Sequence, residues 1–95
     1  MARIEFAARD IGQAPAHGGG ADALYELGLM YCTGRDVEYD LVEAHKWFNL
    51  AALRGNDDAK RYRSELSREM TRGEISVAQK RAREDYKRLS HHKSS

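Results

Sequence analysis

The sequence predicts an all-α protein of about four helices arranged as antiparallel hairpins. Apolar residues recur at steps of three and four along most of the chain after a run of three glycines, and this is the spacing of one helix face. Gly34 and Gly55 stand just past two of these segments, where glycine commonly closes the last turn of a helix. Asp40, Asn56 and Thr71 precede the later segments, and their side chains are of the types that cap helix starts.

The first predicted helix spans about residues 22–33 and carries two apolar faces. Leu24, Leu27 and Tyr31 lie on one side, and Gly28 on the same side permits a second helix to approach closely. The second face consists of Tyr25, Leu29 and Cys32. Because a helix with two apolar faces needs cover on two sides, this second face is either buried by other parts of the chain or offered to a partner.

The second predicted helix spans about residues 40–54 and faces the first. Asp40 and Glu43 have the spacing of a capping box at its start. Its apolar stripe alternates large and small side chains, so that aromatic rings fill the space left by alanines. The stripe residues are Leu41, Ala44, Trp47, Phe48, Ala51 and Ala52. His45 and Lys46 fall between the stripe positions, which places them at the rim of the packed surface or in solvent.

The third predicted helix begins at Asn56 and starts a second copy of the pattern without completing it. Aligned to the first helix at a separation of 36 residues, it pairs Asp58 with Asp22 and Ala59 with Ala23. Its apolar stripe consists of Ala59, Tyr62, Leu66 and Met70. Polar residues then stand where the first helix is apolar, namely Arg63, Ser64 and Ser67. This change predicts a solvated capping segment in place of another stackable repeat.

The fourth predicted helix begins at Thr71, which forms a second capping box with Glu74. Its apolar stripe, which we expect to pack on the second and third helices, consists of Ile75, Ala78, Ala82, Tyr86 and Leu89. Basic residues are interleaved with it, namely Lys80, Arg81, Arg83, Lys87 and Arg88. Such a face suggests nucleic-acid binding, but Glu84 and Asp85 interrupt it and no aromatic side chain lies on it for base stacking. An acidic protein, or the acidic half of a second copy of this chain, is an equally good match for the basic face.

At this point the chain resembles the Sel1-like repeat, a relative of the tetratricopeptide repeat. The matching residues are Ala23, Leu27, Gly28, Tyr31, Gly34, Val37, Asp40, Ala44, Trp47, Ala51, Ala52, Gly55 and Ala59. Asp36 departs from the family, which usually has glycine before the valine of the loop. The resemblance implies an α-solenoid unit that serves as an adaptor in protein complexes, with one full repeat followed by a C-terminal capping hairpin. It carries over no catalytic residue.

Length and composition predict one small domain. We expect a flexible N-terminal arm over residues 1–20, a helical domain over 21–90 and a disordered tail over 91–95. Cys32 is the one cysteine, so an internal disulfide is excluded, and no apolar run long enough for a signal peptide or membrane span opens the chain. A cytoplasmic protein of bacterial type is the natural interpretation. Residues 22–58 carry eight acidic and three basic side chains, whereas residues 59–95 carry five acidic and eleven basic ones.

The candidate catalytic and cofactor-binding residues lack the sequence context that their chemistry needs. The glycines before residue 21 follow no strand and no lysine is placed as in a phosphate-binding loop. Cys32 and His45 can be drawn as a nucleophile and its base, but buried free cysteines usually behave as small hydrophobes. Neither His45 nor the adjacent His91 and His92 has metal-ligand spacing. We therefore expect no enzyme, no cofactor and no metal.

The predicted function is that of a protein-interaction module with a groove between the first and third helices. The candidate contacts with an extended peptide or a partner helix are Tyr25, Leu29, Cys32, Arg54, Arg61 and Arg68. Solenoids usually need about three repeats to bury a continuous core, and this chain has little more than one. A structural homodimer or a small subunit of a larger assembly is therefore the alternative, followed by nucleic-acid binding through the basic fourth helix.

Overall fold

The computed structural model describes residues 20–93 of the 95-residue chain, and the side chains of residues 20–88. In this part of the chain the secondary structure consists of four helices: α2 (Gly20–Thr33), α3 (Leu41–Leu53), α4 (Asp57–Ser67) and α5 (Arg72–Lys93). The all-α prediction is confirmed for these residues. The expected arm lies outside the described residues except for Gly20, which begins α2. The backbone of α5 is helical to Lys93, past the domain boundary expected at residue 90.

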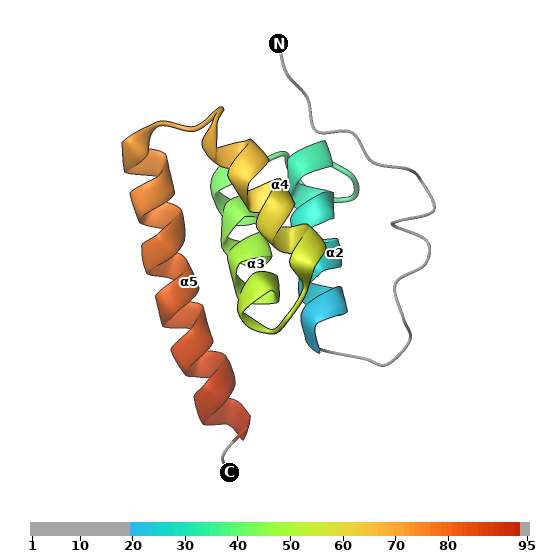
Figure 1. Cartoon of the computed structure of the whole chain (residues 1–95), viewed down its shortest axis with the longest axis vertical. Coiled ribbons are helices and arrows are strands. Elements are labelled where there is room, and N and C mark those ends of the chain that lie inside the picture. The colour runs from blue at the N-terminus through green and yellow to red at the C-terminus, as the bar shows by residue number, and fades with distance from the viewer. Residues whose placement is uncertain (1–19, 94–95) are drawn as a thin grey trace.

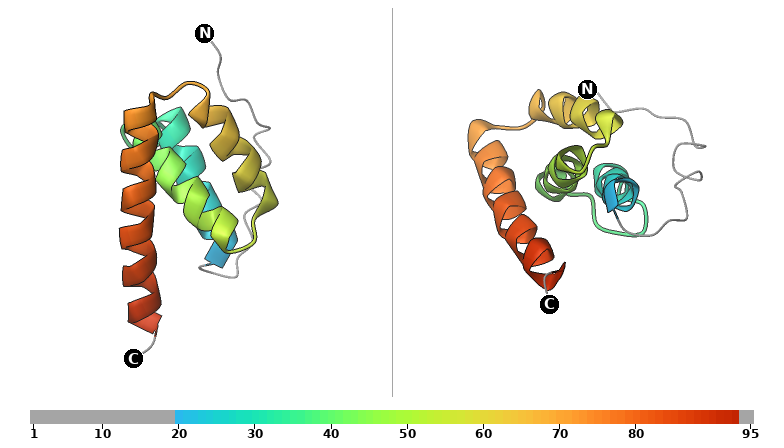
Figure 2. Two further views of the ribbon diagram at one scale, coloured as in Figure 1. Left: turned by 60° about the vertical axis from the view of Figure 1, so that its left-hand side comes forward. Right: turned by 60° about the horizontal axis from the view of Figure 1, so that its bottom comes forward.

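The four helices are arranged around α3 (Figure 1). Successive helices run in opposite directions, and Figure 2 shows α3 enclosed by α2, α4 and α5 on three sides. The prediction that the first two helices form an antiparallel pair is confirmed. The expected packing of the last helix is corrected in one respect: α5 lies along α3 and makes little contact with α4. The two C-terminal helices are therefore joined mainly through their shared neighbour α3.

The interface between α2 and α3 is close because Gly28 has no side chain. A Cβ atom at position 28 would lie 2.6 Å from two ring carbons of Phe48, a separation that real Cβ atoms do not show. The Phe48 ring in turn lies near the Tyr25 ring of α2 and the Tyr62 ring of α4, with centroid separations of 5.9 and 5.6 Å. These three rings form the part of the core where α2, α3 and α4 meet.

Side-chain caps define the starts of the last three helices. Asp40 Oδ1 accepts a hydrogen bond from the Glu43 amide at 3.1 Å, and Asn56 Oδ1 accepts one from the Ala59 amide at 2.8 Å. Asn56 also donates through Nδ2 to Asp22 Oδ1 at 3.0 Å, which ties the start of α4 to α2. These contacts confirm Asp40 and Asn56 as caps.

The two predicted capping boxes differ in completeness. At the start of α5, the Glu74 amide donates to Thr71 Oγ1 at 3.1 Å and the Thr71 amide donates to Glu74 Oε1 at 2.8 Å, so both halves of the box are present. At the start of α3, the Glu43 carboxylate instead pairs with Lys46 and Arg81. Only the half of that box made by the Asp40 side chain is formed, because the Glu43 carboxylate joins α3 to α5.

The turn between α2 and α3 contains two residues in the left-handed backbone region. Gly34 has a φ of +75° and Asp36 a φ of +66°. The turn is closed by hydrogen bonds from the Gly34 amide to the Met30 carbonyl at 2.8 Å and from the Asp40 amide to the Tyr31 carbonyl at 3.0 Å. A positive φ favours glycine and is tolerated by aspartate at a cost. The Sel1-like repeat usually has glycine at the position of Asp36, and the backbone here shows the physical reason.

Candidate protein-interaction surface

Tyr25 and Leu29 belong to the core. Leu29 is 0% exposed and Tyr25 is 9% exposed. The Tyr25 ring lies 6.0 Å from the ring of Tyr62, which α4 brings over this face of α2. Of the two alternatives for the second apolar face of α2, burial is the one observed. The expectation that Tyr25 and Leu29 line an open groove is therefore corrected: α4 covers the face on which they lie.

Cys32 is half-buried, and its thiol is unreactive as a nucleophile. Its Sγ lies 3.6 Å from the Leu29 carbonyl oxygen, one turn earlier in α2. Burial raises the pKa of the Cys32 thiol to about 12, so the thiol stays protonated at neutral pH. A protonated, partly covered thiol is a poor nucleophile. A contact between Cys32 and a partner remains a prediction.

The three candidate arginines are all exposed and lie along the α4 side of the molecule. Arg54 follows the end of α3, Arg61 lies in the middle of α4, and Arg68 caps the end of α4. Arg61 pairs with Asp58 one turn away at 3.0 Å, an exposed contact that contributes little. Arg61 and Arg68 are seven residues apart and therefore share one face of α4. Their role in binding remains a prediction.

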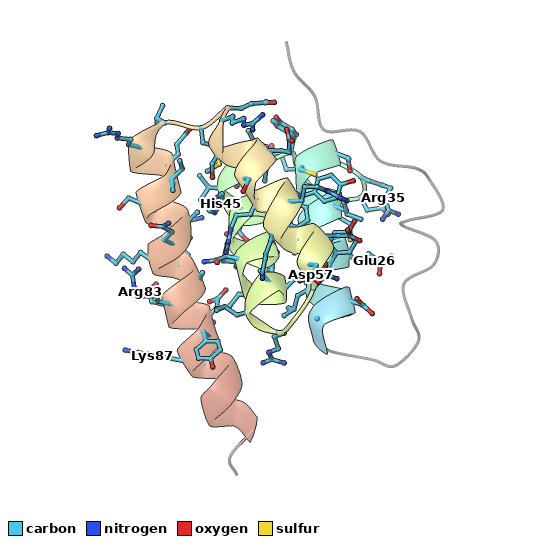
Figure 3. All side chains as sticks on the ribbon, viewed as in Figure 1. Glu26, Arg35, His45, Asp57, Arg83 and Lys87 are labelled. Carbon is cyan, nitrogen blue, oxygen red and sulfur yellow. The ribbon has the colours of Figure 1, made fainter. Side chains whose placement is uncertain are left out.

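A polar contact between α3 and α4 contains His45, which the sequence analysis wrongly placed at the rim. His45 is 2% exposed, and its Nε2 lies 3.0 Å from Ser67 Oγ. The Ser67 hydroxyl donates to the Arg63 carbonyl at 3.0 Å, so Ser67 Oγ accepts from His45 and the imidazole proton is on Nε2. His45 Nδ1 is then a bare acceptor, without a partner in the described part of the chain. Figure 3 shows His45 beside α4.

The surroundings of His45 favour its neutral form. Burial lowers the pKa of His45, and the positive charge of Arg63 lowers it further, to about 4. Arg63 is held in place by Asn49 of α3, whose Oδ1 accepts a hydrogen bond from the guanidinium at 2.6 Å. The α3–α4 interface thus holds a neutral imidazole beside a cation. His45 and Cys32 have different hydrogen-bond partners, namely Ser67 Oγ and the Leu29 carbonyl.

Five charged side chains join α3 to α5, and we refer to them as the α3–α5 ion network. Its members are Glu43, Lys46, Arg81, Asp85 and Arg88. Lys46 Nζ lies 3.0 Å from Glu43 Oε1 and 2.7 Å from Asp85 Oδ2. Arg81 pairs with the other Glu43 oxygen at 3.1 Å, and Arg88 pairs with the other Asp85 oxygen at 2.7 Å. Both carboxylates are therefore shared between two cations.

Lys46 lies at the buried centre of this network. The expectation that its side chain reaches the rim or solvent was therefore wrong. The residue is 7% exposed, and its ammonium group also lies 4.0 Å from the centre of the Trp47 ring. Only two α5 side chains in the described region are fully buried, those of Ala78 and Ala82. Because alanines bury little area, the ion network supplies much of the specific contact between α5 and α3. The sequence offered one local signal, the spacing of Glu43 and Lys46, and none for the pairing with Asp85.

The described residues were also compared with the requirements of a metal site and of a membrane span. Within residues 20–88 no group of three or more histidine, cysteine, aspartate or glutamate side chains is placed to hold a metal ion. In the same part of the chain, no helix combines the length and apolar character needed to cross a membrane. The outer faces of α4 and α5 are polar, and on α5 the exposed basic side chains outnumber the exposed acidic ones.

Comparison with known proteins agrees with this description. A search of curated proteins and a search of solved structures found no significant match. The family model described as Sel1 repeat matches residues 21–56, which comprise α2, the left-handed turn, α3 and the Asn56 cap. These are the elements in which the helix pairing, the close approach at Gly28 and the capped turn were found. The α2–α3 hairpin of this chain is therefore a Sel1-like repeat.

Proposed function

We propose that the protein is a non-enzymatic module that binds another protein through the outer faces of its helices. The observation that carries this proposal is the Sel1 repeat at residues 21–56, because Sel1 repeats generally mediate protein–protein interaction. The hairpin is rigidly packed, so its binding surface is formed before the partner arrives. A preformed surface reduces the entropy lost on binding. The single cysteine is compatible with a reducing compartment, and we place the protein in the cytoplasm.

The test is capture of partners from a lysate of the source cell by the tagged full chain, followed by reconstitution with the purified partner. We expect a protein that is recovered in stoichiometric amounts and that binds directly when both components are pure. The matched negative control is Phe48→Ala, which removes the ring shared by α2, α3 and α4 and should unfold the module at a cost of about 3–5 kcal/mol. Recovery of nothing but the chain itself would contradict the proposal.

The candidate arginines can be tested in the same assay. Arg54, Arg61 and Arg68 are exposed, so their simultaneous replacement by glutamine should leave the helical circular-dichroism signal unchanged. Loss of the captured partner would confirm that the α4 side contacts it. Unchanged capture would show that the partner binds another surface of the molecule.

A second candidate function is a structural role as a homodimer. Four large apolar side chains are more than a third exposed in the described region: Tyr39, Leu53, Val77 and Tyr86. A second copy could bury some of them. In that case the midpoint of thermal unfolding would rise with protein concentration, because association stabilises the folded state by mass action. A midpoint that is constant over a hundredfold range of concentration would count against the dimer.

A further inference from the structure

We propose that the partner of this module carries an acidic helical segment, and that this segment binds along the outer face of α5. The inference rests on the proposed interaction function and specifies the chemistry of the partner. It is carried by four basic residues, Arg72, Lys80, Arg83 and Lys87, which we call the α5 basic strip. All four are exposed, and none takes part in an ion pair within the described residues.

The four residues of the strip lie on one side of α5. At about 100° per residue, their positions fall within an arc of roughly 80° on the helix. The buried Ala78 and Ala82 lie on the other side of α5, against α3. Figure 3 shows the side chains of Arg83 and Lys87 directed away from the other helices. The strip extends over about 22 Å, or four turns, at 1.5 Å per residue.

The acidic residues of α5 leave the strip almost unneutralised. The Glu74 carboxylate caps the Thr71 amide at the helix start. Asp85 lies within the α3–α5 ion network, where it pairs with Lys46 and Arg88. Glu84 is exposed and stands at the edge of the strip. Two of the three acidic side chains of α5 are therefore engaged in contacts within the fold. The four basic side chains of the strip have no acidic partner among the described residues.

An acidic protein segment fits this face better than a nucleic acid does. Val77 is 43% exposed and lies beside Lys80 and Glu84, at spacings of three and seven residues, so it offers an apolar contact next to the charges. An amphipathic helix with carboxylates on one side and an apolar side chain beside them could use both features. Proteins that bind single-stranded nucleic acid typically stack the bases on aromatic side chains, and the four residues of the strip include none.

The experiment measures fluorescence anisotropy of a labelled peptide titrated with the full chain. The peptide is an amphipathic helix with glutamates on one face and leucines beside them, and a scrambled peptide of the same composition is the comparison. The strip variant is Arg83→Gln and Lys87→Gln. The matched control is Arg35→Gln and Lys60→Gln, which removes the same charge from exposed positions outside α5.

We expect the strip variant to bind the amphipathic peptide about fivefold more weakly, because it lacks two exposed charge contacts. The control variant should change the affinity less than twofold. Val77→Ser should weaken binding of the amphipathic peptide and leave binding of the scrambled peptide unchanged. Equal losses of affinity in both double variants, or a larger loss in the control, would overturn the inference. So would tighter binding of a labelled single-stranded or duplex oligonucleotide than of the peptide.

These outcomes are separable from failure of the proposed function. If the lysate assay recovers a direct protein partner that the strip variant still binds at full affinity, the interaction function stands and the α5 basic strip is wrong. If the full chain binds neither the peptide nor any protein from the lysate, both proposals fail.

Discussion

His45 is uncharged in the folded protein because its imidazole is buried between α3 and α4 with Arg63 nearby. Its pKa is lowered from 6.5 to about 4 on folding, so the unfolded chain binds a proton at a higher pH than the folded protein does. The stability that depends on neutral His45 is fully present above pH 6.5. It is lost progressively as the pH falls from 6.5 towards 4.

The first prediction concerns this pH window. Wild type should lose up to about 3 kcal/mol of unfolding free energy between pH 6.5 and 4 through His45, at about 1.36 kcal/mol for each pKa unit. Replacing His45 with glutamine should remove this component and flatten the pH dependence, whatever its effect on stability at pH 7. Urea unfolding at several pH values measures both. Parallel losses in the two proteins would show that other groups cause the acid sensitivity.

Asp36 is the second residue whose local conformation has a measurable cost. Its φ of +66° is one that glycine adopts without a Cβ clash. We expect Asp36→Gly to raise the unfolding free energy by about 0.5–1 kcal/mol, since relief of this conformation outweighs the greater freedom of glycine in the unfolded chain. The control is Glu38→Gly in the same turn, where φ is negative and glycine should destabilise by about 0.5–1 kcal/mol. Thermal unfolding would detect the opposite signs, and equal signs would refute the argument.

At the scale of the element, α5 depends on ion pairs to an extent that the other helices do not. Its described inner face buries Ala78 and Ala82 fully and Ile75 in part, and its remaining specific contacts with α3 pass through the α3–α5 ion network. Lys46 and Asp85 are largely shielded from water, so their attraction is weakly screened. Removing one partner leaves a shielded charge without its counter-charge.

Asp85→Asn should therefore destabilise the protein by about 2 kcal/mol and loosen α5 more than α2 or α3. Hydrogen exchange followed residue by residue would show the difference, with faster exchange of the α5 amides. Glu84→Gln removes one negative charge from the next position, where the side chain is exposed, and should change stability by less than about 0.5 kcal/mol. Uniform loss of protection in all four helices would contradict the view that the network acts on α5.

At the scale of the whole molecule, the sequence was informative about each helix and less informative about what packs on it. Local signals at Asp40, Asn56 and Thr71 located the helix starts, because a cap is formed by residues close together in the chain. The apolar stripes located the interface between α2 and α3. The stripe of the last helix also predicted its packing on α3. The stripes could not show which polar side chains join α3 to α4 and α5, since those contacts link residues that are distant in the sequence.

The candidate site was less predictable than the fold for the same reason. An apolar face such as that of Tyr25 and Leu29 looks alike in sequence whether a partner or another part of the chain covers it. The ring of Tyr62, more than thirty residues later, decides the matter. His45 and Lys46 were misplaced because a periodic stripe identifies only the apolar side of a helix. Arg54, Arg61 and Arg68 are exposed, as a contact with a partner requires, and their function is to be decided by the binding experiments.

The close approach of Gly28 to Phe48 has a consequence for anyone who recombines or redesigns such repeats. The two residues share one volume, since any side chain at position 28 would overlap the ring at position 48. A larger residue at position 28 alone overfills the space, and a smaller residue at position 48 alone leaves a cavity. Each change lowers the unfolding free energy by at most several kcal/mol. Only a paired exchange, with a larger residue at 28 and a smaller one at 48, can conserve the total volume. The residues at positions 28 and 48 therefore have to be kept as a pair when a hairpin of this kind is built into another repeat protein.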